Sequence, residues 1–486
     1  MSAGEDVEVE LKLDLPTGNL NDFAASRALS GIAAQDRGLF ATYFDTPGQD
    51  LRAAGASLRV RRTGEQYVQT IKANASSAVG MFARSEWEHD VAGPAPELDA
   101  ASPLHALISG DVLAHIIPVF TVAVARRQWN VEHGGAIIEI VADVGAVSAA
   151  GRSTAVSEVE LELKRGRPAA LFGLARDLGR DLPLRVGVLT KGQRGYRLLE
   201  TVSAASVKAE RLTLRSDATA AEAFASIADA CLRQFRLNED ILRRDPQAAA
   251  LHQARVALRR LRSALSLFKP ILADAKFEHL AGELRWLAGS LGEARDLDVL
   301  VARVGDEPDE AIVAAHRIAY SEALAALDSQ RARDLFLDLV EWAILGEWRT
   351  QPVKPETVNE RADLFAAQVL GRLRRRLKRR GRDLTRLDDA ERHRVRILGK
   401  KLRYAAGFFE SLYAGKEARQ RFRAFLKRVE ALQDHLGELN DVATAPALVA
   451  RVGLKVNDFS PPGHRGSFLA KAERAYRKWV DAKPFW

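Results

Sequence analysis

Hydrophobic and polar residues alternate with a period of two along much of the first 200 residues. This alternation predicts β-strands with one apolar and one polar face, separated by Pro and Gly turn signals. The clearest predicted strands are Val7–Asp14, Ala56–Arg61, Tyr67–Lys72, Ala83–Asp90, Ala136–Asp143 and Ser157–Lys164. Short helices are predicted over Asn19–Ser30 and Ala169–Leu178.

Beyond about residue 205 the apolar spacing changes to that of a helix. Phe224, Ile227, Cys231 and Phe235, for example, fall on one helix face, and a last helix is predicted near Ser467–Ala482. The change of period predicts a multidomain α+β chain with three parts. These are a strand-rich domain over residues 1–202, a linker over 203–216 and an all-α domain over 217–486.

The helical region contains an internal repeat. The spacing of His252-x-x-Arg255-x-x-x-Arg259-Arg260-Leu261-Arg262 recurs as His393-x-x-Arg396-x-x-x-Lys400-Lys401-Leu402-Arg403. Leu291-Gly292-Glu293 recurs in the same order as Leu436-Gly437-Glu438. Two similar segments in one chain predict a helical bundle with an internal two-fold repeat, with halves at about residues 217–350 and 351–486.

Length and composition predict a folded protein outside the membrane. The chain has 486 residues, more than one ordinary core accommodates, and 47% of them are hydrophobic and 28% charged. No apolar run reaches the roughly 20 residues that a membrane-spanning helix needs. Cys231 is the only cysteine, and the acidic start of the sequence does not resemble a secretory signal. We therefore expect a cytoplasmic location.

The net charge of +8 is unevenly distributed. Residues 1–200 carry 21 Lys and Arg against 25 Asp and Glu, a balance of −4, so the rest of the chain has a balance of +12. The helical part is therefore suited to a polyanionic partner. The strand-rich part must use its acidic groups for another purpose.

The charged residues of the predicted strands share faces. Glu8, Glu10 and Lys12 alternate with apolar residues, and Glu158, Glu160 and Glu162 do the same near the end of the domain. Basic side chains gather on strands between them. A barrel lined by these polar faces sets carboxylates opposite cations. Carboxylates bind divalent cations such as Mg²⁺ or Mn²⁺, and Arg and Lys bind phosphate oxygens, so this lining suits a metal-bound triphosphate.

The strand-rich domain resembles the CYTH superfamily, the triphosphate tunnel metalloenzymes. Glu8-Val9-Glu10-Leu11-Lys12 matches the ExExK signature, and further matching elements follow in order as far as Lys191-x-x-Arg194-Gly195-Tyr196. The resemblance implies an eight-stranded antiparallel β tunnel with flanking helices. It also implies hydrolysis of the terminal phosphate of a triphosphate. Because the sequence shows no base-recognition pocket, the expected substrate is inorganic tripolyphosphate, cleaved to diphosphate plus phosphate.

The same resemblance assigns roles to residues of this chain. The metal ligands it implies are Glu8, Glu10, Asp143, Glu158, Glu160 and Glu162, with Glu139 as an alternative to Asp143. The triphosphate-binding cations it implies are Lys12, Arg59, Arg61, Lys72, Arg84, Arg126, Lys191 and Arg194. Glu8, Glu10, Lys12 and Glu160 are the catalytic candidates, with Glu160 or Lys12 as proton acceptor.

The repeated motifs of the helical domain place like charges on one helix face. His252, Arg255, Arg259 and Arg262 are spaced three, four and three residues apart, and the second motif repeats this spacing. Like charges one turn apart cost about 0.2–0.5 kcal/mol per pair, which favours a bound polyanion that offsets the repulsion. A solvated basic face is the alternative.

These motifs resemble the CHAD domain, a helical module, from about residue 215 onward. The resemblance implies that inorganic polyphosphate binds in a basic central groove. The residues implied are His252, Arg255, Arg259, Arg260, Arg262, Arg285, Arg295, His393, Arg396, Lys400, Lys401 and Arg403. The basic run Arg372–Arg380 could extend this surface or be a solvated helix exterior.

Other functions remain open at this point. The chain could be a polyphosphate-binding or targeting protein with little activity, or its substrate could be a nucleoside or thiamine triphosphate. Nucleic acid is a less favoured partner, because the basic helices lack the interleaved aromatic residues of stacking platforms. The sequence does not distinguish Mg²⁺ from Mn²⁺ and does not give the oligomeric state.

Overall fold

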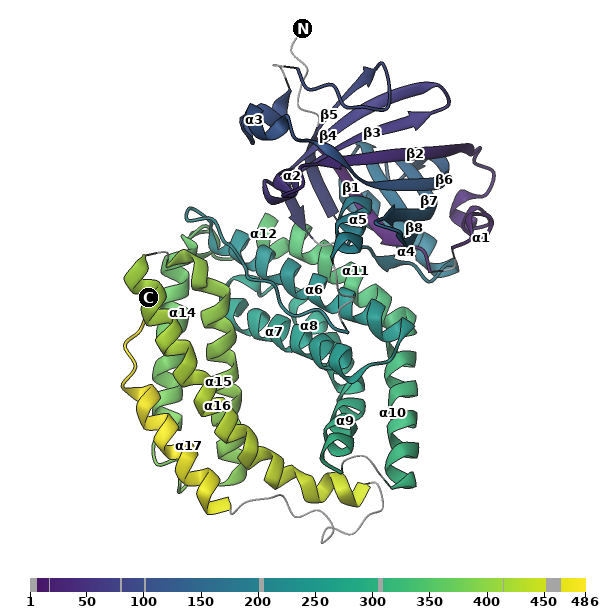
Figure 1. Cartoon of the computed structure of the whole chain (residues 1–486). Helices are drawn as coiled ribbons and strands as arrows, with labels where there is room; N and C mark the ends of the chain where they lie inside the picture. Colours follow the sequence, from purple (N-terminus) through teal and green to yellow (C-terminus); the bar gives the residue numbers. More distant parts are fainter. Residues whose placement is uncertain are drawn as a thin grey trace. The chain divides into compact units, whose positions relative to one another are not determined.

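The computed structural model describes residues 7–16, 18–78, 81–99, 102–200, 205–304, 309–413, 415–451 and 465–486. Contacts between residues divide the chain into two compact units (Figure 1). The first unit is Met1–Ala204 together with Asp328–Glu341, and the second is Ala205–Leu327 together with Trp342–Trp486.

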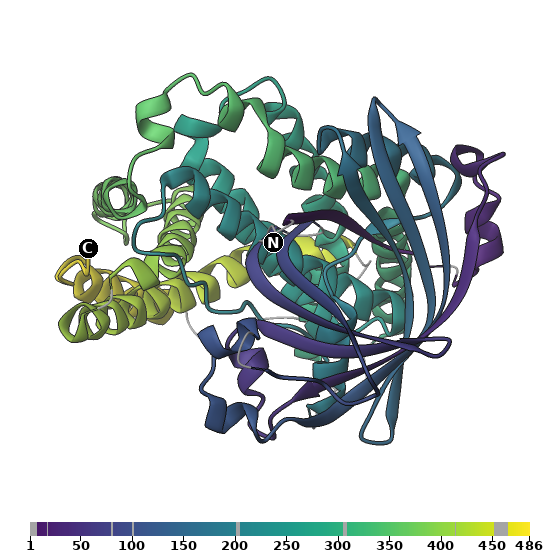
Figure 2. The same cartoon turned by 90° about the horizontal axis from the view of Figure 1, so that it is seen from above.

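The first unit is built on a nine-stranded antiparallel sheet. Its strands are β1 (Val7–Asp14), β2 (Gln35–Asp45), β3 (Ala56–Thr63), β4 (Gln66–Ala78), β5 (Met81–Val91), β6 (Ile117–His133), β7 (Ala136–Ala149), β8 (Arg152–Arg165) and β9 (Arg185–Val186). Their order across the sheet is β5-β4-β3-β2-β6-β7-β8-β1-β9, and β1 also pairs with β5. The sheet therefore has one strand more than the eight predicted, the two-residue β9. Figure 2 shows how strongly the sheet curls.

Both faces of the sheet are covered, as the alternation of β1 shows. Leu11 and Leu13 on one side of this strand are buried, and so are Glu10 and Lys12 on the other. The apolar side packs against α4 (Ala169–Asp181), which contacts β1, β6 and β8 and buries a row of residues including Phe172. The polar side consequently faces the interior of the curled sheet, where water is scarce.

Short helices complete the first unit. They are α1 (Leu20–Ala24), α2 (Asp50–Ala53), α3 (Gly110–Leu113), α4 and α5 (Lys191–Leu199). The helical structure predicted over Asn19–Ser30 is present as two separate short segments. These are α1, which Asn19 caps, and a 3₁₀ turn over Arg27–Leu29.

The second unit is all-helical among its described residues. Its long helices are α6 (Ala220–Arg244), α7 (Ala248–Leu272), α8 (Phe277–Ser290), α9 (Gly292–Val304), α10 (Glu310–Asp328), α14 (Ala362–Arg380), α15 (Asp389–Phe409), α16 (Lys416–Arg451) and α17 (Arg465–Val480). The helix α11 (Gln330–Leu345) belongs to the first unit as far as Glu341 and to the second from Trp342 onward. Two short helices, α12 (Glu347–Thr350) and α13 (Pro355–Val358), follow it. An aromatic core that includes Phe224, Phe268 and Trp342 joins α6, α7 and α11. Among all the described residues, no helix has the length and apolarity to cross a membrane.

Candidate functional site

Three carboxylates meet inside the first unit. Asp143 of β7 and Glu158 and Glu160 of β8 offer oxygen atoms that all lie within 4.8 Å of one another. The antiparallel register explains this, because Asp143 stands opposite Glu158 on the neighbouring strand and Glu160 is the next residue on the same face of β8. We call these three residues the acid triad. Asp143 and Glu158 are fully buried.

Two lysines on different elements contact the acid triad. Lys12 of β1 lies opposite Glu160 in the β1–β8 ladder, donates to that carboxylate and contacts Glu158 Oε1 at 2.9 Å. Lys191, the first residue of α5, has its Nζ 2.7 Å from Asp143 Oδ2 and 2.5 Å from Glu158 Oε1. Burial lowers the pKa of both ammonium groups, but the surrounding carboxylates outweigh it. The pKa of Lys12 is raised, and that of Lys191 is raised well above its ordinary value.

An arginine completes the charge balance. Arg126 of β6 forms a bidentate pair with Asp143, with Nε–Oδ1 and Nη2–Oδ2 distances of 2.8 and 2.7 Å. Burial opposes ionisation of the triad, yet Lys191 and Arg126 hold the pKa of Asp143 below its ordinary value. Lys12, Lys191 and Arg126 hold the pKa of Glu160 far below its ordinary value. Three carboxylates and three cations therefore lie together, and Asp143, Glu160, Lys12 and Lys191 are held in their charged forms in a largely buried group.

The local structure of α5 fixes the position of Lys191 beside the acid triad. Thr190 accepts from the backbone N–H of Gln193, whose side chain accepts from the Thr190 N–H, so the helix starts at Lys191 with a capping box. Three residues on, Arg194 reaches Asp14 at 2.9 Å. Gly195 allows α5 to approach β6, because a Cβ there would lie 2.3 Å from the Phe120 ring.

A second charged group lies on β3, β4 and β5. Lys72 pairs with Glu86 at 2.9 Å, and Arg61 lies 3.4 Å from Glu88. Arg59 is 3.8 Å from each of these two carboxylates. The pKa of Arg61 is lowered, first by burial and then by the positive charges of Arg59 and Arg126. Arg61 on β3 and Arg126 on β6 therefore face the same interior, although two other strands separate them along the chain.

The structure thus brings together most, but not all, of the residues suggested by the sequence. Glu10 is buried and acts on Lys12 through its charge. Glu162 lies beyond the acid triad and pairs with Lys164 at 2.5 Å. Glu139 accepts from Gln128 at 2.6 Å, again apart from the triad. Glu8 and Arg84 are paired positions of β1 and β5, but their side chains lie outside those described.

Sequence reasoning did not identify Glu86 and Glu88 as partners of the cations. The hairpin register carries the signal, because Lys72 stands opposite Glu86 and Thr70 stands opposite Glu88. Tyr43 was also missed. It stands opposite Arg59 in the β2–β3 ladder and contributes to the raised pKa of that arginine.

The second unit contains a different kind of charged group, formed where α7 and α15 contact each other. Most of its members act on one another as like charges. They are Arg255, Arg259 and Arg262 of α7, Arg285 of α8, Arg295 of α9, and Arg396, Lys400 and Arg403 of α15. We call these eight residues the basic cluster.

Electrostatics within the basic cluster is unfavourable. Burial first, and then Arg396, Arg259 and Arg403, lower the pKa of Lys400 to about 8. His252 beside the cluster has its pKa lowered to about 4 by burial and then by Arg295, Arg259 and other cations, so it is neutral at pH 7. The buried Nε atoms of Arg259, Arg396 and Arg403 lack a hydrogen-bond partner. An anion bound here would offset the repulsion between the cations and would accept hydrogen bonds from these Nε–H groups.

Other basic residues of the two repeated motifs lie elsewhere. Arg260 is buried on another side of α7, where it donates to Gln234 at 2.8 Å and lies over the Phe408 ring. Lys401 donates to Ser266, and burial and then the charge of Arg376 lower its pKa. His393 pairs with Asn440 at 2.6 Å. The repeated spacing alone does not separate these roles.

Comparison with known protein families agrees with this division. The CYTH domain profile matches residues 6–196, and the CHAD domain profile matches residues 226–450. An inorganic triphosphatase from Haemophilus influenzae is 28% identical over 163 residues, which is 32% of this chain and 45% of that protein. The chain therefore spans less than half the length of this relative.

Solved structures resemble each part separately. The crystal structure of the CHAD domain from the plant Ricinus communis is 29% identical, with a TM-score of 0.45, over 58% of this chain and 94% of that one. A putative adenylyl cyclase from Hippeastrum, described as having a dominant triphosphatase activity, is 17% identical, with a TM-score of 0.30. That match covers 40% of this chain and 97% of the other.

Proposed function

Since the chain is a CYTH domain followed by a CHAD domain, we propose that it is a metal-dependent inorganic triphosphatase whose helical domain binds inorganic polyphosphate. The reaction is cleavage of tripolyphosphate to diphosphate and phosphate. The observation that carries the proposal is the acid triad together with Lys12, Lys191 and Arg126. A triphosphate with its metal ion needs carboxylates and cations side by side, and this interior supplies both.

The substrate in this proposal occupies the interior of a tunnel of eight strands. The additional pairing of β1 with β5 supports it, because it connects the two ends of the series β5-β4-β3-β2-β6-β7-β8-β1. The charge of Arg126 on Arg61 supports it as well, since the two guanidinium groups come from β6 and β3.

The residues of the acid triad fit a hard divalent ion. All the donors are carboxylate oxygens, and Glu158 Oε2 is buried without a hydrogen-bond partner. We assign Asp143, Glu158 and Glu160 to hold Mg²⁺ or Mn²⁺. The bound ion offsets phosphate charge and orients a water molecule. Glu8 and Glu10 remain further candidate ligands from the family resemblance, whereas Glu162 pairs with Lys164 outside the acid triad.

The cations position the phosphate chain. Arg59, Arg61 and Arg126 present guanidinium groups that bind phosphate oxygens in bidentate fashion. Lys72, Arg84 and Arg194 extend the set. Lys12 and Lys191 balance the triad and neutralise charge on the reacting phosphate. Phosphoryl transfer depends mainly on such positioning and charge neutralisation.

The pKa values separate the two candidates for proton acceptor. Burial lowers the pKa of Lys12, but Glu158 and Glu160 outweigh it, so the pKa is raised and the side chain is an ammonium that accepts no proton. Glu160 is ionised, with its pKa far below the ordinary value because of Lys12, Lys191 and Arg126. We therefore assign Lys12 the electrostatic role. Glu160 stays the candidate acceptor from the family resemblance alone, since a strongly lowered pKa makes its carboxylate a weak base.

The basic cluster supports the second half of the proposal. Polyphosphate is a flexible chain of repeated negative charges. Cations that repel one another, with buried Nε atoms that lack acceptors, provide a complementary surface. The choice of polyphosphate over other polyanions rests on the family resemblance. An internal two-fold repeat that relates α7 to α15 is part of the same proposal.

Measuring phosphate release from a substrate panel tests this function. Purified full-length protein is given tripolyphosphate, ATP, thiamine triphosphate or long-chain polyphosphate, with Mg²⁺, with Mn²⁺ and with chelator. We expect metal-dependent turnover that is fastest on tripolyphosphate. Faster turnover of ATP or thiamine triphosphate would correct the substrate. Absence of metal-dependent turnover on all four, with polyphosphate still bound, would support the alternative of a binding or targeting protein.

A further inference from the structure

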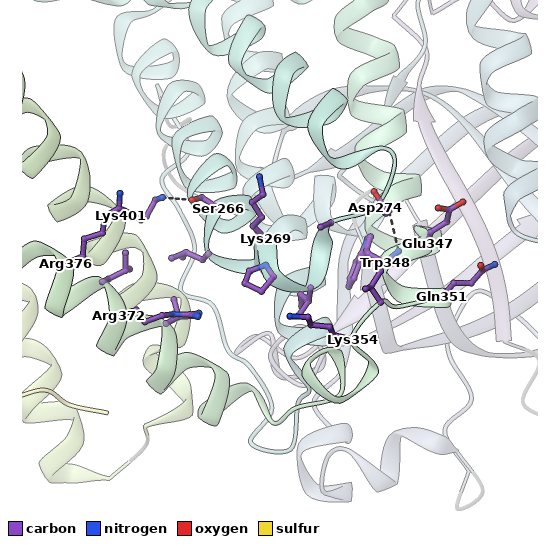
Figure 3. Close-up of a pocket in the computed structure, with 17 residues that line it drawn as sticks. Ser266, Lys269, Asp274, Glu347, Trp348, Gln351, Lys354, Arg372, Arg376 and Lys401 are labelled. Carbon is purple, nitrogen blue, oxygen red and sulfur yellow. Dashed lines mark hydrogen bonds between the residues drawn. The ribbon is translucent and has the colours of Figure 1, made fainter.

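A separate cavity of about 710 Å³ lies within the helical unit, at the end of α7 (Figure 3). It is bounded by the C-terminal part of α7, the middle of α14, Lys401 of α15 and the segment from Glu347 to Lys354. Its volume is that of a small-molecule site, roughly 300–1,000 Å³. None of the eight residues of the basic cluster lines it.

One end of the cavity is cationic. Figure 3 shows Arg372, Arg376 and Lys401 gathered on one side. Lys401 is only partly exposed, and burial first and then the charge of Arg376 lower its pKa. Among the described residues, no carboxylate forms an ion pair with any of these three side chains. A dianionic group such as a phosphate offsets this concentration of positive charge.

Part of the lining of the cavity is apolar. It consists of Leu267, Pro270 and Ile271 of α7 and of Val369 and Leu373 of α14. Inorganic phosphate or polyphosphate has no apolar surface to place here. A ligand that fills the cavity therefore has a hydrophobic or flat body attached to its anionic group.

The opposite end is polar. Glu347 and Gln351 lie there in Figure 3, away from the three cations. Lys354 lies between this end and the three cations in Figure 3, and Lys269, which also lines the cavity, pairs with Glu278 at 2.8 Å. Asp274 is also near, but its carboxylate already accepts from Trp342 Nε1 and from the backbone N–H groups of Lys276 and Phe277. Glu347 and Gln351 thus supply a carboxylate and an amide to a ligand whose far edge bears hydrogen-bond donors and acceptors. An alkyl chain has no donor or acceptor that could hydrogen-bond to these two side chains.

We propose that this cavity binds a nucleoside phosphate. The phosphate contacts Arg372, Arg376 and Lys401, the base lies against the apolar side chains of α7 and α14, and the edge of the base meets Gln351 and Glu347. Amide and carboxylate side chains are the groups that proteins use to bind the polar edges of bases. The proposal concerns a site apart from the acid triad and the basic cluster, and it does not depend on the triphosphatase activity.

Equilibrium dialysis of the full-length protein with AMP and GMP tests the proposal. These probes lack a triphosphate chain, so the interior of the first unit does not consume them. We expect saturable one-site binding of at least one probe. Arg376→Glu is expected to weaken it about tenfold or more, because a charge-assisted phosphate contact is lost. Gln351→Ala is expected to weaken nucleotide binding but not the binding of ribose 5-phosphate.

Matched variants and competing probes decide the outcome. Arg419→Glu reverses the charge of an exposed arginine of α16 that does not line the cavity, and it should leave AMP and GMP binding unchanged. Three results would overturn the proposal. They are binding no tighter than that of inorganic phosphate, binding that survives Arg376→Glu, and tighter binding of dodecyl phosphate than of either nucleotide.

Discussion

The two charged groups of this protein, one buried and one half-buried, are built on opposite principles. In the first unit, the acid triad faces Lys12, Lys191 and Arg126, and every charge has an opposite charge within hydrogen-bonding reach. In the second unit, the basic cluster places cations beside cations, so that burial and mutual repulsion lower the pKa of Lys400 to about 8. A balanced interior keeps all its groups charged at neutral pH. Cations beside cations raise the free energy of the unliganded protein by their mutual repulsion, and a bound anion offsets that repulsion.

This difference suits the acid triad with its cations and the basic cluster to different functions. A site that rearranges phosphate bonds needs fixed charges of both signs, so that a metal ion and phosphate oxygens are held together. A site that only holds a polyanion needs cations, and its affinity comes from relieved repulsion and released counterions. The predictions below test this contrast, starting with the largest expected effect.

The largest effect is expected from removing one carboxylate of the acid triad. Glu160→Gln keeps the shape of the side chain but removes a candidate metal ligand and leaves Lys12 and Lys191 with less opposing charge. We expect tripolyphosphate turnover with Mg²⁺ or Mn²⁺ to fall by about 100-fold or more. Phosphate release measured at saturating metal checks this, and binding of long-chain polyphosphate should not change.

Glu162→Gln is the matched control for this variant. Glu162 is on the same face of β8, but it pairs with Lys164 and stands outside the acid triad. We expect its effect on turnover to be much smaller than that of Glu160→Gln. Equal losses in the two variants would mean that the triad is not the metal-binding group.

The second largest effect is expected in the basic cluster. Arg259→Glu reverses a charge that contributes to the lowered pKa values of Arg255, Arg396 and Lys400. We expect the affinity for long-chain polyphosphate to fall about 100-fold, since a charge-assisted contact becomes a repulsion. Fluorescence anisotropy with labelled polyphosphate at fixed salt measures it. Tripolyphosphate turnover in the same variant should be unchanged, and a parallel loss of turnover would contradict the separation of the two sites.

These two sites could be predicted from the sequence to different degrees. Period-two alternation places Glu158 and Glu160 on one face of a strand, and β1 was predicted with its observed bounds, Val7–Asp14. Alternation does not give the partner strand, however. That Lys12 stands opposite Glu160, or that Asp143 stands opposite Glu158, is set by long-range strand register.

Strands without clean alternation were missed altogether. β2 and β6 pair with each other along most of β2, and neither was among the predicted strands. The first half of β2 is exposed and contains Gly38, so its local pattern resembles a loop. Pairing with β6 stabilises it as a strand, which is a tertiary effect that no local window contains.

A smaller effect is expected from pH, and only in the basic cluster. Lys400 has a pKa of about 8 in the free protein, so it is an ammonium at pH 7 and largely neutral at pH 9. Polyphosphate binds the charged form, and its affinity should therefore fall as pH rises, by about tenfold if one charge-assisted contact is lost. Titration of labelled polyphosphate between pH 7 and 9 measures the fall.

Lys400→Arg sharpens this test. An arginine keeps its charge across the whole range, so the variant should bind polyphosphate equally well at pH 7 and pH 9. A pH dependence that persists in Lys400→Arg would assign the titrating group elsewhere. His252 is not that group, because burial and the nearby arginines lower its pKa to about 4, below this range.

The smallest effect on binding is expected at Arg260, the direct neighbour of Arg259. Its side chain is buried, donates to Gln234 and lies over the Phe408 ring, with its Cζ 5.4 Å from the ring centroid. Arg260→Gln should therefore leave polyphosphate affinity within about twofold and lower the free energy of unfolding of the helical unit by about 1–3 kcal/mol. Urea unfolding followed by far-ultraviolet circular dichroism measures the second quantity. If Arg260→Gln instead abolished polyphosphate binding while the helices stayed as stable as before, position in the repeated motif would matter more than the direction of the side chain. The basic cluster would then have to include both faces of α7.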